Sequence, residues 1–208
     1  MQKEDGIDDI AEKLRAYLGT EFKPVGITLY ADGMPGPHPP EPATFCNLVR
    51  EAAQGKEFLI TEDDFLCFNA QLPLGVVQPN YVNIEPRIKS EIRSIRIGSL
   101  EACDVVLLIL NPEQLMIVSS LLGGIEATFK GDMAVCGEAV AQVYNTGRPN
   151  VSFLCMGART LGGFQPVEMV LGIPRTIFMT LGDRMTHRAS LSQEARAKAA
   201  SLVLKHSR

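Results

Sequence analysis

The chain has 208 residues, 46% of them apolar, and a formal net charge of −4. This length and apolar content suffice for one hydrophobic core, so we expect a single domain over residues 1–208. The scattered lysines and arginines exclude the clustered basic face that nucleic acid or an anionic membrane requires. No apolar run reaches the roughly 18 residues of a membrane span, and the acidic start does not resemble a secretory signal. We expect a cytoplasmic protein without nucleic-acid or membrane partners; the sequence leaves a homo-oligomer open.

The first half of the chain predicts two helices and a strand. Apolar residues at helical spacing predict a helix over 7–18 that stops at Gly19, and a buried strand follows at 24–30. Segment 33–42 is rich in proline and glycine, which predicts an extended surface loop. We interpret it as a solvated connector, with a ligand lid as the alternative. Thr44 then predicts the start of a helix that runs to about residue 54 and stops at Gly55.

The second half predicts a central strand and its junction with a helix. The apolar run 104–110 is the clearest strand, and Asn111, Pro112 and Gln114 are typical of the start of a helix that Gly123 ends. Helix capping is a sufficient reason for an asparagine at position 111. Ligands also bind at the carboxyl ends of strands, and Asn111 directly follows the strand expected at 104–110. Further strands are expected at 126–129 and 150–154, and a helix at 192–206. The fold class is therefore α+β or α/β, a mixed sheet with helices packed against it.

The cysteines follow a repeated pattern. Cys46 to Cys67 and Cys136 to Cys155 both contain a cysteine, a helix, Gly-Lys or Gly-Arg, a strand and Phe-Leu-Cys. Cys46 and, with Asp132 as the expected cap, Cys136 lie near helix starts, where the helix dipole stabilises thiolates. Two such pseudo-repeated units around a two-fold axis would bring the four thiols together. The alternative is that these cysteines are simply buried apolar residues.

The chemistry of the four cysteines indicates a metal site. Thiols of a cytosolic protein rarely form structural disulfides, and soft sulfur ligands select iron-sulfur clusters, zinc or cuprous copper. Because the cysteines are widely spaced and form no Cys-x-x-Cys pair, they suit a [4Fe-4S] cluster better than zinc, which stays the alternative. Cys103 lies outside the repeat and is predicted to be a small core residue.

The segment after Cys155 suggests a binding site for a small anionic molecule. Gly157 and two later glycines surround Arg159, whose guanidinium could bind an anion while backbone N–H groups face it. Glu168 follows closely, as a substrate contact or a member of an ion pair. With Asn111, these residues are the candidate substrate-binding set. The other functional classes are a metal-free binding or regulatory module and, less favoured with only three histidines, a thiol enzyme using Cys46.

The same residues carry a resemblance to a known family. The segments from Phe45 to Cys67 and from Ala134 to Arg159, the sequence NPEQ and the sequence VEMVLGIP resemble domain of unknown function 169, common in archaea and anaerobic bacteria. The resemblance implies that cysteines matching Cys46, Cys67, Cys136 and Cys155 recur, which favours a thiolate site, and it implies no activity. The chain departs from the family in its proline-rich loop and at Phe68 and Asn69, where we expect Lys or Gly.

Overall fold

The structure is a computed structural model that describes residues 6–77, 87–127 and 136–188. Residues 128 and 129 of the strand expected at 126–129, the expected cap Asp132 and the expected helix 192–206 lie outside the described residues.

Seven strands form one mixed sheet in the order β2-β3-β1-β4-β7-β6-β5. The pair β5–β6 is parallel, and the other pairs are antiparallel. The predicted mixed sheet is thus confirmed. The strands are β1 (Val25–Tyr30), β2 (Phe58–Ile60), β3 (Ser94–Gly98), β4 (Val105–Leu110), β5 (Glu126–Ala127), β6 (Asn150–Ser152) and β7 (Met169–Pro174).

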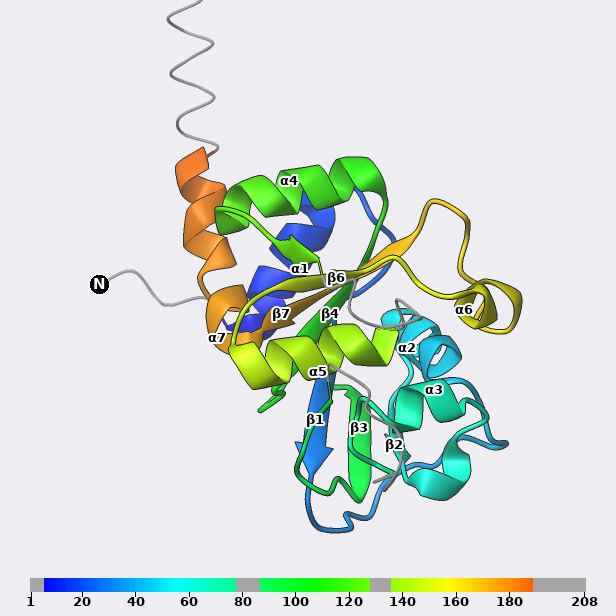
Figure 1. Cartoon of the computed structure of the whole chain (residues 1–208). Coiled ribbons are helices and arrows are strands. Elements are labelled where there is room, and N and C mark those ends of the chain that lie inside the picture. The colour runs from blue at the N-terminus through cyan, green and yellow to red at the C-terminus, as the bar shows by residue number, and fades with distance from the viewer. Residues whose placement is uncertain (1–5, 78–86, 128–135, 189–208) are drawn as a thin grey trace, which may run out of the picture.

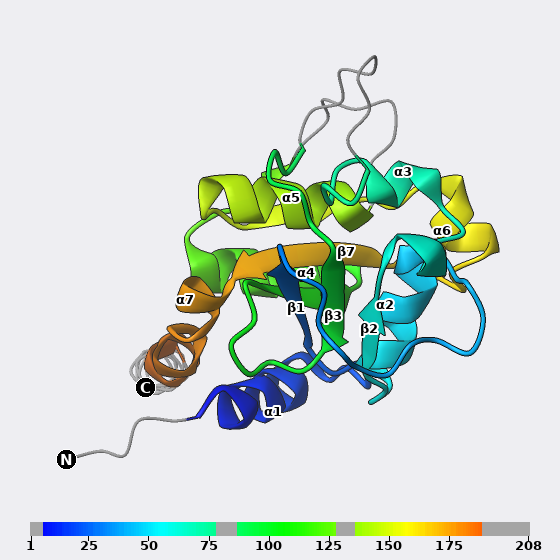
Figure 2. The same cartoon turned by 90° about the horizontal axis from the view of Figure 1, so that it is seen from below.

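Helices cover both faces of the sheet. Figure 1 shows α4 and α5 on opposite sides of β6 and β7, and Figure 2 shows α1 on the face opposite to α5. Residues 181–188 are also helical. The named helices are α1 (Ile7–Leu18), α2 (Phe45–Ala53), the 3₁₀ turn η1 (Glu62–Asp64), α3 (Phe68–Gln71), α4 (Pro112–Leu122), α5 (Cys136–Thr146), α6 (Met156–Thr160) and α7 (Arg175–Phe178).

The two faces of the sheet bury two separate cores. Alternation along β4 divides its residues: Val105, Leu107 and Ile109 pack with α2 and α5, whereas the residues between them pack with α1 and α4. Cys46 and Cys136 lie in the first core, and Cys103 lies in the second. The central sheet therefore separates Cys103 from these two thiols.

The predicted helix boundaries are confirmed by their caps. Gly19 ends α1 in the left-handed conformation with φ 62°, and the Thr44 hydroxyl accepts a hydrogen bond of 3.1 Å from the backbone N–H of Asn47. Asn111 and Gln114 each accept a 2.9 Å hydrogen bond from the other's backbone N–H, which forms a capping box at the start of α4.

Sequence analysis missed two strands in the interior of the sheet, β3 between β2 and β1, and β7. Strand β7 lies between β4 and β6 and is buried along its whole length. Its apolar run, from Met169 to Pro174, is a recognisable strand signal that ends in proline. In the sequence this segment carries part of the family resemblance and directly follows Glu168, but no strand is expected there.

The strands on the two sides of the β1–β4 pair follow the same order. From that pair outward, the sheet contains β1, β3 and β2 on one side and β4, β7 and β6 on the other. Helix α2 precedes β2, and α5 precedes β6. This equivalent connectivity fits two pseudo-repeated units, and the two-fold axis itself stays a prediction.

Candidate thiol site

Each of the four repeated cysteines lies at or beside the start of a helix. Cys46 is the second residue of α2 and Cys136 the first of α5, while Cys67 precedes α3 and Cys155 precedes α6. Both α2 and α3 contact α5, and both views show α2, α3 and α6 gathered at one end of the molecule (Figures 1 and 2). The fold thus brings together segments that are far apart in the sequence.

Cys46 and Cys136 form a hydrogen-bonded pair of buried thiols. The hydrogen bond from the Cys136 side chain lowers the pKa of Cys46, although burial opposes this shift. The same hydrogen bond, with burial, raises the pKa of Cys136 well above its ordinary value. Cys46 is therefore the thiol that ionises first, and Cys136 is the neutral donor that stabilises the thiolate.

Cys67 and Cys155 lie within electrostatic reach of this pair. Burial raises the pKa of Cys67, and charges on Cys46 and Cys155 add to the effect. A charge on Cys155 also contributes to the raised pKa of Cys136. These interactions connect the four thiols in a ring from Cys46 through Cys136 and Cys155 to Cys67. Such coupling means that the four thiols share one neighbourhood.

The arrangement of the four thiols bears on which metal group they could hold. Among residues 6–77, 87–127 and 136–188, no group of three or more His, Cys, Asp or Glu side chains has the arrangement of a metal-ion site. A zinc ion places its sulfur ligands about 2.3 Å from one point, whereas a [4Fe-4S] cluster holds its four cysteines further apart. Ligation of either metal group by these thiols stays a prediction.

The residues that follow α6 pack closely against Cys46. A methyl group on Gly162 would lie 3.2 Å from the Cβ of Cys46 and only 2.7 Å from the backbone oxygen of Ala158. A methyl group on Gly157 would lie 3.5 Å from the Sγ of Cys155, which is an ordinary contact. Gly162 is thus needed for the approach of α6 to α2.

Arg159 fastens the segment that follows the site. Its guanidinium donates hydrogen bonds to the backbone carbonyls of Gln165, of Phe153 at 2.9 Å and of Glu168 at 3.1 Å. The expected glycine-lined turn is the helix α6, in which the N–H of Gly162 donates to the carbonyl of Gly157. A role for Arg159 and Gly157 in binding an anion stays a prediction, alongside these structural contacts.

Glu168 forms an ion pair with a residue that sequence analysis did not single out. Its carboxylate accepts hydrogen bonds of 2.6 Å from Arg50 Nη1 and 2.7 Å from the N–H of Gln165. The Arg50 guanidinium also lies 4.9 Å from the ring centre of Phe22 and 5.4 Å from that of Phe164. Since Arg50 and Glu168 are 118 residues apart, no local pattern could have found their pairing.

The side chain of Asn111 caps a helix on the opposite face of the sheet from Cys46 and Cys136. Its carboxamide oxygen caps α4, and α4 packs into the core of the face opposite to Cys46 and Cys136. A role in substrate binding stays a prediction.

The structure does place the buried Glu138 two residues after Cys136, in the first turn of α5. Sequence analysis missed this carboxylate, which the motif CGEA could have suggested.

The fold and the gathered cysteines define a mixed α/β protein with a buried thiol site. The sequence profile of domain of unknown function 169, described as "Uncharacterised ArCR", matches residues 13–96 and 82–183. The chain belongs to this family.

Comparison with curated proteins finds an uncharacterised protein of Methanocaldococcus jannaschii that is 30% identical over 102 residues. This similarity covers 45% of the chain and 44% of the archaeal protein, so the chain spans less than half the length of this relative. No solved structure matches the chain. In the described part of the chain, every helix is too short or too polar to cross a membrane.

Proposed function

We propose that Cys46, Cys67, Cys136 and Cys155 hold a [4Fe-4S] cluster that acts in redox or Lewis-acid chemistry on a small anionic molecule. The placement of these four cysteines at or beside the starts of α2, α3, α5 and α6, which the fold gathers at one end of the molecule, carries the proposal. A cluster with four protein ligands supplies electrons, whereas one with three leaves an iron open to a substrate.

The chain's own residues would prepare this site in three ways. The first turn of α2 and the hydrogen bond from Cys136 favour the thiolate of Cys46, which is the form that binds metal. Low solvent exposure of Cys46 and Cys136, at 7% and 0%, excludes water from the thiols. The ion pair between Arg50 and Glu168 holds α2 against the segment after α6, and so fixes Cys46 relative to Cys155.

Anaerobic reconstitution with iron and sulfide tests the proposal. We expect uptake of about four irons and four sulfides per chain, with a brown colour and absorbance near 400 nm, as a cubane requires. Cys46→Ala and Cys136→Ala should each abolish most of the uptake. Cys103→Ala is the matched control, because Cys103 lies in the core on the other face of the sheet, and it should take up as much iron as the unchanged protein.

The alternative function is a metal-free module that binds a small molecule and uses the thiols only for packing. The direct hydrogen bond between Cys46 and Cys136 favours it, because the two thiols already satisfy each other. Equal, low iron content in the unchanged protein and in Cys46→Ala would support this module and contradict the cluster. Stoichiometric zinc without iron would identify a structural metal instead.

A further inference from the structure

A pocket of about 480 Å³ lies between the proline-rich loop and α2. This volume is within the range of roughly 300–1,000 Å³ that holds small ligands. Two of its apolar residues, Leu66 and Leu161, are 67% and 68% exposed, so a ligand that covers them would gain free energy from the burial of apolar surface. The apolar lining includes Pro39, Pro42, Leu48, Phe58, Leu66 and Leu161.

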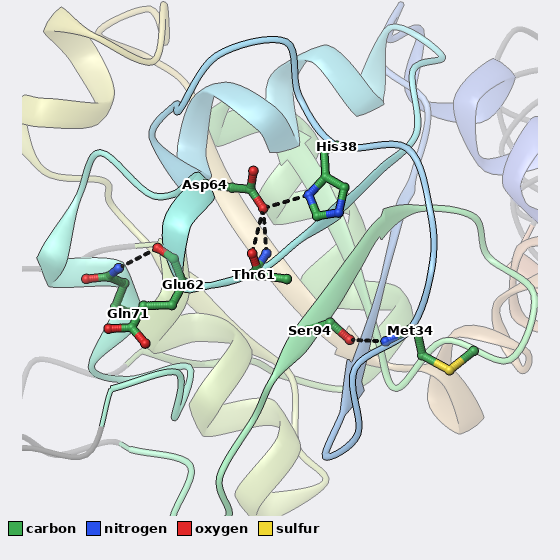
Figure 3. A network of polar contacts seen from close by, with 7 residues as sticks. All are labelled: Met34, His38, Thr61, Glu62, Asp64, Gln71 and Ser94. Carbon is green, nitrogen blue, oxygen red and sulfur yellow. Dashed lines mark hydrogen bonds and ion pairs between the residues drawn. The ribbon is translucent and has the colours of Figure 1, made fainter.

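The proline-rich loop forms a fixed wall of this pocket. Figure 3 shows the His38 ring beside the Asp64 carboxylate of η1, with Nδ1 and Oδ2 2.9 Å apart. The same carboxylate accepts hydrogen bonds from the backbone N–H and the hydroxyl of Thr61, at 2.7 and 3.0 Å. Asp64 therefore joins the loop to the start of η1.

Backbone contacts hold the two ends of the same loop. At one end, the N–H of Met34 donates to the Ser94 hydroxyl at 3.3 Å (Figure 3). Near the middle, the N–H of Leu59 donates to the carbonyl of Pro37 at 2.8 Å. At the other end, Ala43 exchanges backbone hydrogen bonds with residues 64 and 66, at 2.9 and 3.0 Å. With φ fixed at its prolines, the loop is preorganised, which lowers the entropic cost of binding a ligand.

The polar groups of the pocket carry both signs of charge. Lys56 pairs with Glu51 at 2.9 Å, and Glu41 adds a second carboxylate. In the described part of the chain, the side chains of Glu41 and Asn47 have no hydrogen-bonding or ionic partner in the protein. A purely anionic ligand would meet two carboxylates here, whereas a molecule with an amine and a carboxylate would meet complementary charges.

We propose that this pocket binds a small zwitterion with an apolar body, of the apolar α-amino-acid class. Its ammonium group pairs with Glu41, its carboxylate pairs with Lys56, and the carboxamide of Asn47 hydrogen-bonds to either group. The apolar side chain of the ligand covers Leu66 and Leu161. The lining of the pocket contains no cysteine, so binding there does not require the proposed cluster.

The pocket adjoins the thiol site through the first turn of α2. Thr44 and Asn47 line the pocket, whereas Cys46 between them packs into the core. A ligand that binds Asn47 therefore contacts the helical turn that carries Cys46. This coupling, which rests on the proposed function, makes the zwitterion either the substrate of the thiol site or its regulator.

Calorimetric titration of the reduced protein with L-leucine tests the pocket. 4-Methylpentanoate, which lacks the amine, and isopentylamine, which lacks the carboxylate, are the probes for each charge. We expect L-leucine to bind at least about tenfold more tightly than either analogue, since each charge then meets its partner. Equal affinity for L-leucine and one analogue, or no heat of binding at millimolar concentration, would overturn the zwitterion assignment.

Two variants locate the binding site. Glu41→Gln should weaken L-leucine binding about tenfold while leaving the affinity for 4-methylpentanoate unchanged, because only the amine contact is lost. Glu57→Gln is the matched control, because Glu57 lies outside this pocket and the substitution makes the same change in charge. An equal loss in both variants would contradict the site. Binding in Cys46→Ala separates the two proposals: L-leucine still binds there if the pocket is right, whether or not the unchanged protein takes up iron.

Discussion

At the scale of single residues, the five cysteines have three different environments. Cys46 and Cys136 share a hydrogen bond in a dry core, and Cys67 and Cys155 lie at the more exposed edge of the same site. Cys103 is 4% exposed in the core on the other face. The same residue type therefore has a proposed ligand role in four positions and a packing role in the fifth.

The buried thiol of Cys103 should make the free energy of unfolding depend on pH at alkaline pH. Substitution of Cys103 should remove this dependence. Burial raises the pKa of its thiol from 9.0 to about 11. Because the unfolded chain loses this proton first, the free energy of unfolding should fall as pH rises from 9 to 11. Urea denaturation at a series of pH values measures the free energy of unfolding, and in Cys103→Ala we expect it to fall less steeply between pH 9 and 11. The difference in slope between the two proteins should vanish between pH 6 and 8, and a difference that persists there would contradict the assignment.

At the scale of secondary-structure elements, short polar signals decide where helices begin. The capping box of Asn111 and Gln114 satisfies two backbone N–H groups, and the Gln114 amide also donates to the carbonyl of Leu18 at 3.2 Å. This last contact joins the start of α4 to the end of α1. The cap is thus both a local start signal for α4 and a tertiary contact with the end of α1.

Substitution of Asn111 should reveal its capping role. Asn111→Ala removes the acceptor for the N–H of Gln114 and should lower the free energy of unfolding by about 1 kcal/mol. Asn111→Ser keeps a side-chain oxygen at the cap and should change stability by less than about 0.5 kcal/mol. Urea denaturation of both variants measures the difference. Equal loss in the two variants would mean that the carboxamide has another role, of which substrate binding is the one already proposed.

At the scale of the whole molecule, the pair of Arg50 and Glu168 joins the two halves of the chain. The side chains are 19% and 12% exposed, and the Arg50 guanidinium lies over two phenylalanine rings. Their geometry holds α2 against the segment between α6 and β7. The ion pair is therefore placed to keep two of the proposed cluster ligands in register.

Removal of the Arg50 charge should lower the free energy of unfolding by more than the loss of an exposed surface ion pair does. Arg50→Met leaves the largely buried Glu168 carboxylate without its cation, and we expect a loss of about 2–3 kcal/mol in the free energy of unfolding. Arg50→Lys keeps the charge but loses the planar stacking, so its loss should be intermediate. Thermal and urea unfolding measure both variants. A loss below about 0.5 kcal/mol in Arg50→Met would show that the pair behaves as a solvated surface contact.

The sequence by itself determined the local features of this protein. Gly19, Thr44 and Asn111 specified helix ends because capping acts within four residues, and the apolar run 105–110 specified a buried strand. The cysteine pattern also predicted that four of the five thiols belong to one site. The proline content of the loop 33–42 predicted its extended form, although its role as a wall of a pocket was not foreseen.

Only the tertiary structure decided how these features meet. The position of β7 between β4 and β6, the hydrogen bond between Cys46 and Cys136 and the ion pair of Arg50 with Glu168 all join distant segments. Such pairings depend on which strands are neighbours and on which face of the sheet each helix packs. Sequence periodicity specifies that a face is buried, but not what covers it, because burial of apolar surface is non-directional.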